Sequence, residues 1–171
     1  MSFNKKEEQL INNLLSTNHQ VVINTLEEVK STGSSKLLPF LIDLLHASTN
    51  DDIKTMTYKI LAELKQTDAI PVLVEAIRNE KYFQEQEILI RSCWENGLDY
   101  TPYLSVFIDL VIHGDYMTSF EAFTVIENLE GTIGEEENEK LVMLLQNSLA
   151  DSSPEKQALL EELIQIVPRL K

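Results

Sequence analysis

The chain is poor in residues that cross-link or interrupt a fold, with one cysteine, five glycines and five prolines in 171 residues. A single cysteine cannot form an internal disulfide, which favours a reducing compartment over a disulfide-stapled secreted fold. Alternation of apolar and polar residues at period two, which would indicate strands, is also absent. Hydrophobic residues nevertheless make up 43% of the chain, so the composition is that of a globular protein with a sizeable core.

Long apolar runs are missing as well. No stretch approaches the length that crosses a bilayer, and the first residues lack the apolar core of a secretory signal. There is no glycine-rich phosphate loop either. A soluble, cytoplasmic protein is therefore expected.

Basic residues are absent from one long internal segment. Between Ser92 and Glu139 there is no lysine or arginine, whereas 11 of the 28 acidic residues fall there, and the whole chain carries a formal charge of −14. Such a segment would repel a phosphate backbone and attract a basic protein surface. The charge distribution thus predicts a protein partner with a basic or amphipathic segment, and neither nucleic acid nor membrane.

A short proline-containing turn recurs at nearly equal intervals. Its prolines are 32 and 31 residues apart, and its three copies are Leu38-Pro39-Phe40-Leu41, Ile70-Pro71-Val72-Leu73 and Thr101-Pro102-Tyr103-Leu104. Proline is tolerated in the first turn of a helix because the amides there have no intrahelical acceptor. A period of this length, with a helix on either side of each loop, indicates a stack of helical hairpins.

Apolar residues at positions i, i+3 and i+4 extend this pattern to ten helices in about five antiparallel pairs. The pairs span approximately residues 5–30, 36–65, 68–95, 101–130 and 135–170, within one domain over residues 1–171. The predicted fold class is therefore all-α.

The repeated turn resembles that of the HEAT repeats. The first helix of those repeats carries a leucine-proline-x-leucine stretch, which Leu38-Pro39-Phe40-Leu41 and Ile70-Pro71-Val72-Leu73 match, and the second begins with an aliphatic-basic pair, as Ile53-Lys54 does. The resemblance covers about residues 36–130 and departs at Thr57, where the family usually has alanine. It implies an armadillo-like, right-handed α–α superhelix whose second helices line a concave, partner-binding face.

No constellation of catalytic or metal-ligating residues stands out. The histidines His19, His46 and His113 fall near helix ends in three different pairs, whereas a metal site needs several converging ligands. Cys93 lies on an apolar seam without an adjacent base, so we expect a buried structural thiol rather than a nucleophile. The protein is therefore expected to be non-enzymatic and to use no cofactor or metal.

Aromatic residues on the predicted second helices indicate a binding surface. In the helix predicted over residues 115–130 they form a second apolar stripe, about a third of a turn from the core stripe. An aromatic floor with an acidic rim is typical of protein interfaces. The candidate partner-binding residues in this groove are Tyr58, Trp94, Glu95, Asp115, Tyr116, Phe120, Glu121, Phe123 and Glu127.

Three alternatives stay open at this point. Stacked repeats bury a wide arc of each helix, so the phenylalanines could belong to the core. The aromatic stripe could instead join two copies in a homo-oligomeric structural or assembly element. An enzyme or a nucleic-acid-binding protein on the same scaffold is the third, since a fold does not determine function.

Overall fold

The computed structural model describes residues 3–32 and 35–170. Over these residues the chain is all-helical, with ten α-helices, four short 3-10 segments and no strand, which confirms the predicted fold class. The α-helices are α1 (Lys5–Leu14), α2 (His19–Thr32), α3 (Leu38–Ala47), α4 (Asp51–Ala62), α5 (Ala69–Ile77), α6 (Gln86–Asn96), α7 (Leu104–His113), α8 (Tyr116–Glu127), α9 (Glu135–Ser148) and α10 (Pro154–Ile166). None of the described helices is long and apolar enough to span a membrane.

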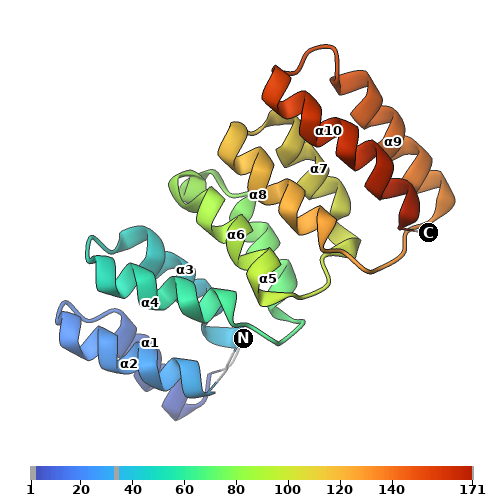
Figure 1. Cartoon of the computed structure of the whole chain (residues 1–171). Coiled ribbons are helices and arrows are strands. Elements are labelled where there is room, and N and C mark those ends of the chain that lie inside the picture. Colours follow the sequence, from blue (N-terminus) through green and yellow to red (C-terminus); the bar gives the residue numbers. More distant parts are fainter. Residues whose placement is uncertain (1–2, 33–34, 171) are drawn as a thin grey trace.

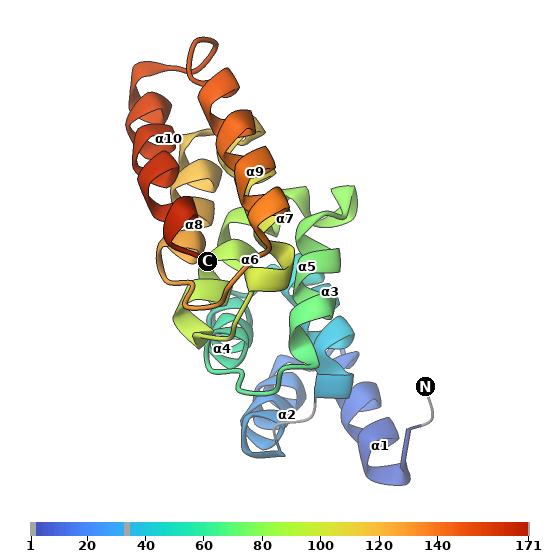
Figure 2. The same ribbon diagram turned by 90° about the vertical axis from the view of Figure 1, so that its right-hand side faces the viewer.

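The helices lie in two layers, which Figure 2 shows edge-on. The odd-numbered helices form one layer, here called the first-helix layer, and the even-numbered helices form the second-helix layer. Each odd-numbered helix packs against the even-numbered helix that follows it, and the resulting pairs succeed one another from the N-terminal to the C-terminal end of the molecule (Figure 1). Within the second-helix layer, α4 contacts α2 and α6, and α8 contacts α6 and α10.

Polar side chains define several helix ends. The side chains of Asn4, Asn50 and Asp115 accept hydrogen bonds from first-turn amides of α1, α4 and α8, and so satisfy donors that the helix leaves free. Gly97 ends α6 in the left-handed conformation, with a φ of 65°, which glycine after the last helical residue commonly adopts. Asn4 and Gly97 thus mark outer ends of helix pairs, whereas Asn50 and Asp115 start the second helix within a pair.

The apolar pattern predicts that the second helix of the third pair starts near Tyr82, but in the structure it starts later. The segment Glu80–Glu85 forms a 3-10 stretch, η2, and α6 begins only at Gln86. Tyr82 interrupts the helical backbone with φ −105° and ψ 23°, and its hydroxyl donates to Asp43 of α3 at 2.6 Å. The hydrogen bond between Tyr82 and α3 therefore holds η2 in place. The local pattern of apolar residues could not reveal this contact.

One apolar cluster runs through all five pairs, from Leu10 in α1 to Leu170 after α10. The leucines that follow the recurrent prolines, Leu41, Leu73 and Leu104, are 2%, 0% and 1% exposed, which confirms that they face inward. Since each pair contributes one stripe to a shared core, the pairs depend on their neighbours for burial.

Hydrogen bonds and ion pairs tie each of the first three pairs to the pair that follows it, at intervals close to the proline period. They join residues 33, 33, 31 and 30 apart: Lys30 to Glu63, Ser35 to Asp68, Lys65 to the carbonyl of Asn96, and Arg91 to Glu121. Corresponding positions of successive pairs thus face one another, as expected for a repeated unit.

Candidate functional site

Three exposed apolar side chains gather in the first turns of α8. Tyr116, Met117 and Phe120 are 47%, 43% and 43% exposed, and we call them the α8 patch. Tyr116 and Phe120 lie one turn apart, and their ring centroids are 6.4 Å apart with 30° between the ring planes. The alternative that the aromatic stripe belongs to the core is therefore wrong for these two residues.

Phe123 does not join the patch, contrary to its inclusion in the predicted aromatic floor. Its side chain is only 9% exposed and belongs to the apolar cluster. Both flanks of α8 are covered, because α6 packs on one side and α10 also contacts the helix. The core alternative is thus correct for Phe123, and the exposed part of α8 is narrower than the sequence predicted.

Glu121 is buried, whereas the sequence placed it on an exposed acidic rim. Its side chain is 3% exposed and lies on the side of α8 that faces α6. Its Oε1 accepts hydrogen bonds from Nε and Nη2 of Arg91 at 2.8 and 2.6 Å, and its Oε2 accepts one from Nε1 of Trp94 at 2.7 Å. These bonds to Glu121 raise the pKa of Arg91. Two predicted site residues, Trp94 and Glu121, therefore contact each other. Their hydrogen bond lies between α6 and α8 and is part of the helix packing.

Tyr58 of α4, at the other end of the predicted aromatic floor, is half-buried. Its hydroxyl is buried and makes no hydrogen bond with the described residues. Burial, and then the nearby carboxylate of Glu95, raise the pKa of Tyr58. Glu95 itself is exposed. This corner of the second-helix layer is mainly a helix-packing contact, with the exposed carboxylate of Glu95 at its edge.

Two exposed carboxylates flank the α8 patch along its helix. Asp115 precedes Tyr116 and accepts a hydrogen bond from the backbone N–H of Thr118 at 2.8 Å, which lowers its pKa and keeps it ionised. Glu127 lies seven residues beyond Phe120, or about two turns, and hence on the same side of α8. Within the described residues Glu127 forms no ion pair.

Within the described residues, four cations from outside the base-free segment contact it in space, among them Lys65 at the carbonyl of Asn96 and Lys140 beside Glu136. The other two contact α8 or the turn just before it. One is Arg91, which lies beside Glu87 and Glu121. The other is Lys156 of α10, whose Nζ donates to the carbonyl of Gly114 at 2.9 Å, just beyond the end of α7. Burial lowers the pKa of Lys156, and Asp115 opposes this shift. The surroundings of the patch are therefore less uniformly acidic than the sequence alone indicates.

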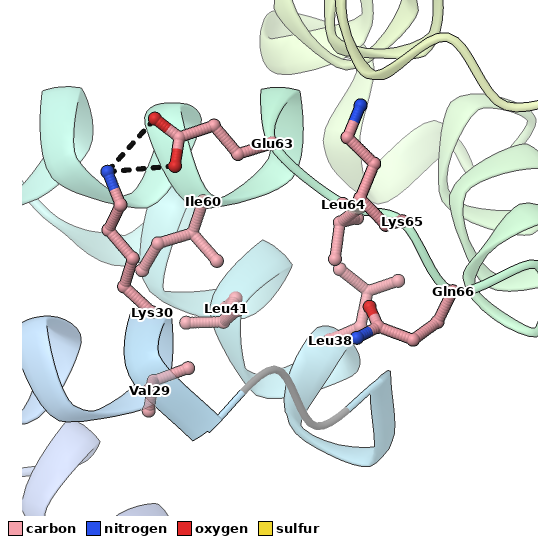
Figure 3. A pocket seen from close by; sticks show the side chains of 9 residues that line it. All are labelled: Val29, Lys30, Leu38, Leu41, Ile60, Glu63, Leu64, Lys65 and Gln66. Carbon is pink, nitrogen blue, oxygen red and sulfur yellow. Dashed lines mark hydrogen bonds and ion pairs between the residues drawn. The ribbon is translucent and has the colours of Figure 1, made fainter.

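A small pocket lies between α2, α3 and α4, as Figure 3 shows from close by. It measures about 140 Å³, its wall is formed by leucine, isoleucine and valine side chains, and the ion pair between Lys30 and Glu63 stands at its rim. It contains none of the candidate residues. The three residues of the α8 patch do not line this pocket either.

Groups that could perform chemistry are dispersed. Among residues 3–32 and 35–170 no three histidine, cysteine, aspartate or glutamate side chains are placed to hold a metal ion. Cys93 is fully buried, as predicted, and burial raises the pKa of its thiol to about 12. Among the described residues we therefore take the α8 patch with its two flanking carboxylates as the candidate site.

Fold and surface together define the class: an all-helical protein of stacked helix pairs with an exposed aromatic patch beside acidic residues. No model of a protein family matches the chain. No curated protein matches it. Among solved structures, the chain is similar to an engineered protein from the Northeast Structural Genomics Consortium, with 15% identity and a TM-score of 0.49 over 95% of this chain and 79% of that chain.

Proposed function

We propose that this protein is a non-enzymatic protein-interaction module whose α8 patch binds a basic, amphipathic segment of a partner protein. The observation that carries the proposal is the pairing of two half-exposed rings, Tyr116 and Phe120, with the carboxylates of Asp115 and Glu127 on the same helix. Rings supply buried contact area at the centre of an interface, and surrounding charges select and steer the partner.

We further propose that the stack is a right-handed α–α superhelix of the HEAT-repeat kind. Neighbouring helices contact one another more extensively in the second-helix layer than in the first-helix layer. When a row of helix pairs curves, the helices on the inner side of the curve lie closer together than those on the outer side. The second-helix layer would therefore be the inner side. The α8 patch would then lie on the inner side of the curve, where a partner segment meets several helices at once.

The environment we propose is the cytoplasm. The single thiol is buried and has no partner cysteine, which suits a reducing compartment.

Comparative affinity capture tests the proposed function. The full-length protein, Phe120→Ala and Met143→Ala are immobilised, and proteins retained from the native cell are identified and their contacts mapped by cross-linking. Met143 is the matched control because it is 62% exposed but lies on α9 in the other layer. We expect a protein retained by the wild type and Met143→Ala but lost with Phe120→Ala, with a basic, amphipathic segment at the cross-link.

Two outcomes would contradict the proposal. Capture that Phe120→Ala and Glu127→Lys leave unchanged would remove the α8 patch as the binding surface. Sedimentation that finds a dimer for the wild type and a monomer for Phe120→Ala would instead assign the patch to self-association, the homo-oligomeric alternative.

A further inference from the structure

The rings of the α8 patch are close enough to act as one platform. Tyr116 and Phe120 have centroids 6.4 Å apart, a tilt of only 30°, and nearly half of each side chain is open to solvent. We propose that this platform recognises an arginine of the partner, whose planar guanidinium stacks on the two rings. This inference rests on the proposed function and specifies the residue that its surface selects.

Electrostatics favour a cation at this place. The face of an aromatic ring is the negative end of its quadrupole, and guanidinium is planar and weakly hydrated, so it stacks on rings more readily than ammonium. Asp115 and Glu127 add negative charge on either side of the rings. A guanidinium over the platform would therefore meet both a ring face and a carboxylate.

The protein does not supply this cation itself. Arg91 is held by Glu87 and Glu121, and Lys156 donates to a backbone carbonyl at the end of α7. Within the described chain the cation–π contact is made elsewhere, where Nζ of Lys81 lies 4.8 Å from the ring centroid of Tyr82. Tyr82 thus receives its cation from a neighbour in the chain, whereas no cation of the described residues lies over the ring of Tyr116 or Phe120.

Leucine substitution separates stacking from simple apolar contact, because it keeps a large apolar side chain and removes the ring. Phe120→Leu is the test variant. Met117→Leu is the matched control, since Met117 is equally exposed in the same patch but has no ring. Both positions are on the surface, and far-UV circular dichroism verifies that both variants keep the helical fold.

The probes are two synthetic amphipathic helical peptides of about 16 residues, long enough to form a helix on a surface. They are identical except for one arginine or lysine at the border of the apolar face. Fluorescence anisotropy of each peptide with the full-length protein gives the ratio of the two dissociation constants. For the wild type and Met117→Leu we expect the arginine peptide to bind roughly two- to five-fold more tightly. For Phe120→Leu we expect a ratio near one.

The outcomes separate this inference from the function on which it rests. If both peptides bind and the ratio is the same for the wild type and Phe120→Leu, the rings act only as apolar surface and the arginine proposal is wrong, while the proposed function stands. If neither peptide binds more tightly to the wild type than to Phe120→Ala, both proposals are overturned.

Discussion

At position 121 a carboxylate is buried between two helices and bonded at both oxygens. Arg91 and Trp94 together direct three donors at it. Taking a charge out of water is costly unless donors and a counter-charge replace the lost hydration. The contact therefore stabilises the α6–α8 junction only while all three side chains are present.

Replacing Glu121 by glutamine removes the negative charge and one of the acceptors while keeping the size of the side chain. We expect Glu121→Gln to lower the free energy of unfolding by about 2 kcal/mol, the range for hydrogen bonds to charged groups. Urea denaturation followed by circular dichroism measures the change. The control is Glu127→Gln on the exposed side of the same helix, with an effect within about 0.5 kcal/mol. Equal effects for the two variants would contradict the role assigned to Glu121.

The thiol of Cys93 provides a second prediction at the scale of single residues. Burial raises its pKa to about 12, so the folded protein holds the thiol in the protonated, unreactive form at and above neutral pH. We expect no reaction with a thiol-specific disulfide reagent between pH 7 and about pH 9, and one equivalent after denaturation. Rapid labelling of the folded protein at pH 8 would contradict this prediction, because it would show that the packing around Cys93 in α6 opens to solvent.

Backbone conformation at one residue decides how α6 ends. Gly97 has a φ of 65°, a region that residues with a Cβ adopt at a cost. A Cβ at Gly97 would meet no atom within 4 Å, so a substitution there tests the backbone alone.

We expect Gly97→Ala to destabilise the protein by about 1 kcal/mol. Thermal unfolding compared with Gly134→Ala gives the test, because a Cβ at Gly134 also meets nothing within 4 Å, while its φ is an ordinary −66°. Gly134 is the N-cap of α9, where alanine is less favourable than glycine, but alanine also restricts the unfolded chain. Because these effects oppose each other, Gly134→Ala should change stability by only a few tenths of a kcal/mol. If the two substitutions behave alike, the left-handed conformation of Gly97 is not what stabilises the end of α6.

Over the whole molecule, negative charge exceeds positive charge by 14. Several acids on α8, α9 and the connection between them are exposed, Glu127, Glu130 and Glu139 among them. Like charges on one compact body repel each other, and salt screens this repulsion over distances that shrink from ~30 Å at ~0.01 M to ~8 Å at ~0.15 M.

We therefore expect the Tm to rise by a few degrees when NaCl is raised from about 0.01 M to about 0.15 M. Differential scanning calorimetry measures the shift. A triple variant with glutamine in place of Glu127, Glu130 and Glu139 carries three fewer negative charges and should respond less. A Tm that falls with salt would mean that the ion pairs between helix pairs outweigh the net repulsion.

Much of the architecture follows from residue patterns. The recurrent proline turns, the i, i+3, i+4 leucines and the end of α6 at Gly97 each correspond to a feature of the structure. The exposure of Tyr116 and Phe120 does not follow from their place off the core stripe of their helix, because Phe123 lies on the same stripe and is buried. The start of α6 does not follow, because the bond from Tyr82 to Asp43 joins residues 39 apart.

The sequence alone determined that the chain is all-α and paired along its length, because helical periodicity and capping are local properties. It also determined which segment lacks bases. Only the tertiary structure decided that Glu121 and Phe123 are buried while Tyr116 and Phe120 remain open, and that Arg91 and Lys156 reach the base-free segment. The physical reason is that each side of α8 is covered or left bare according to where α6 and α10 pack, and this spacing depends on contacts between residues far apart in the chain.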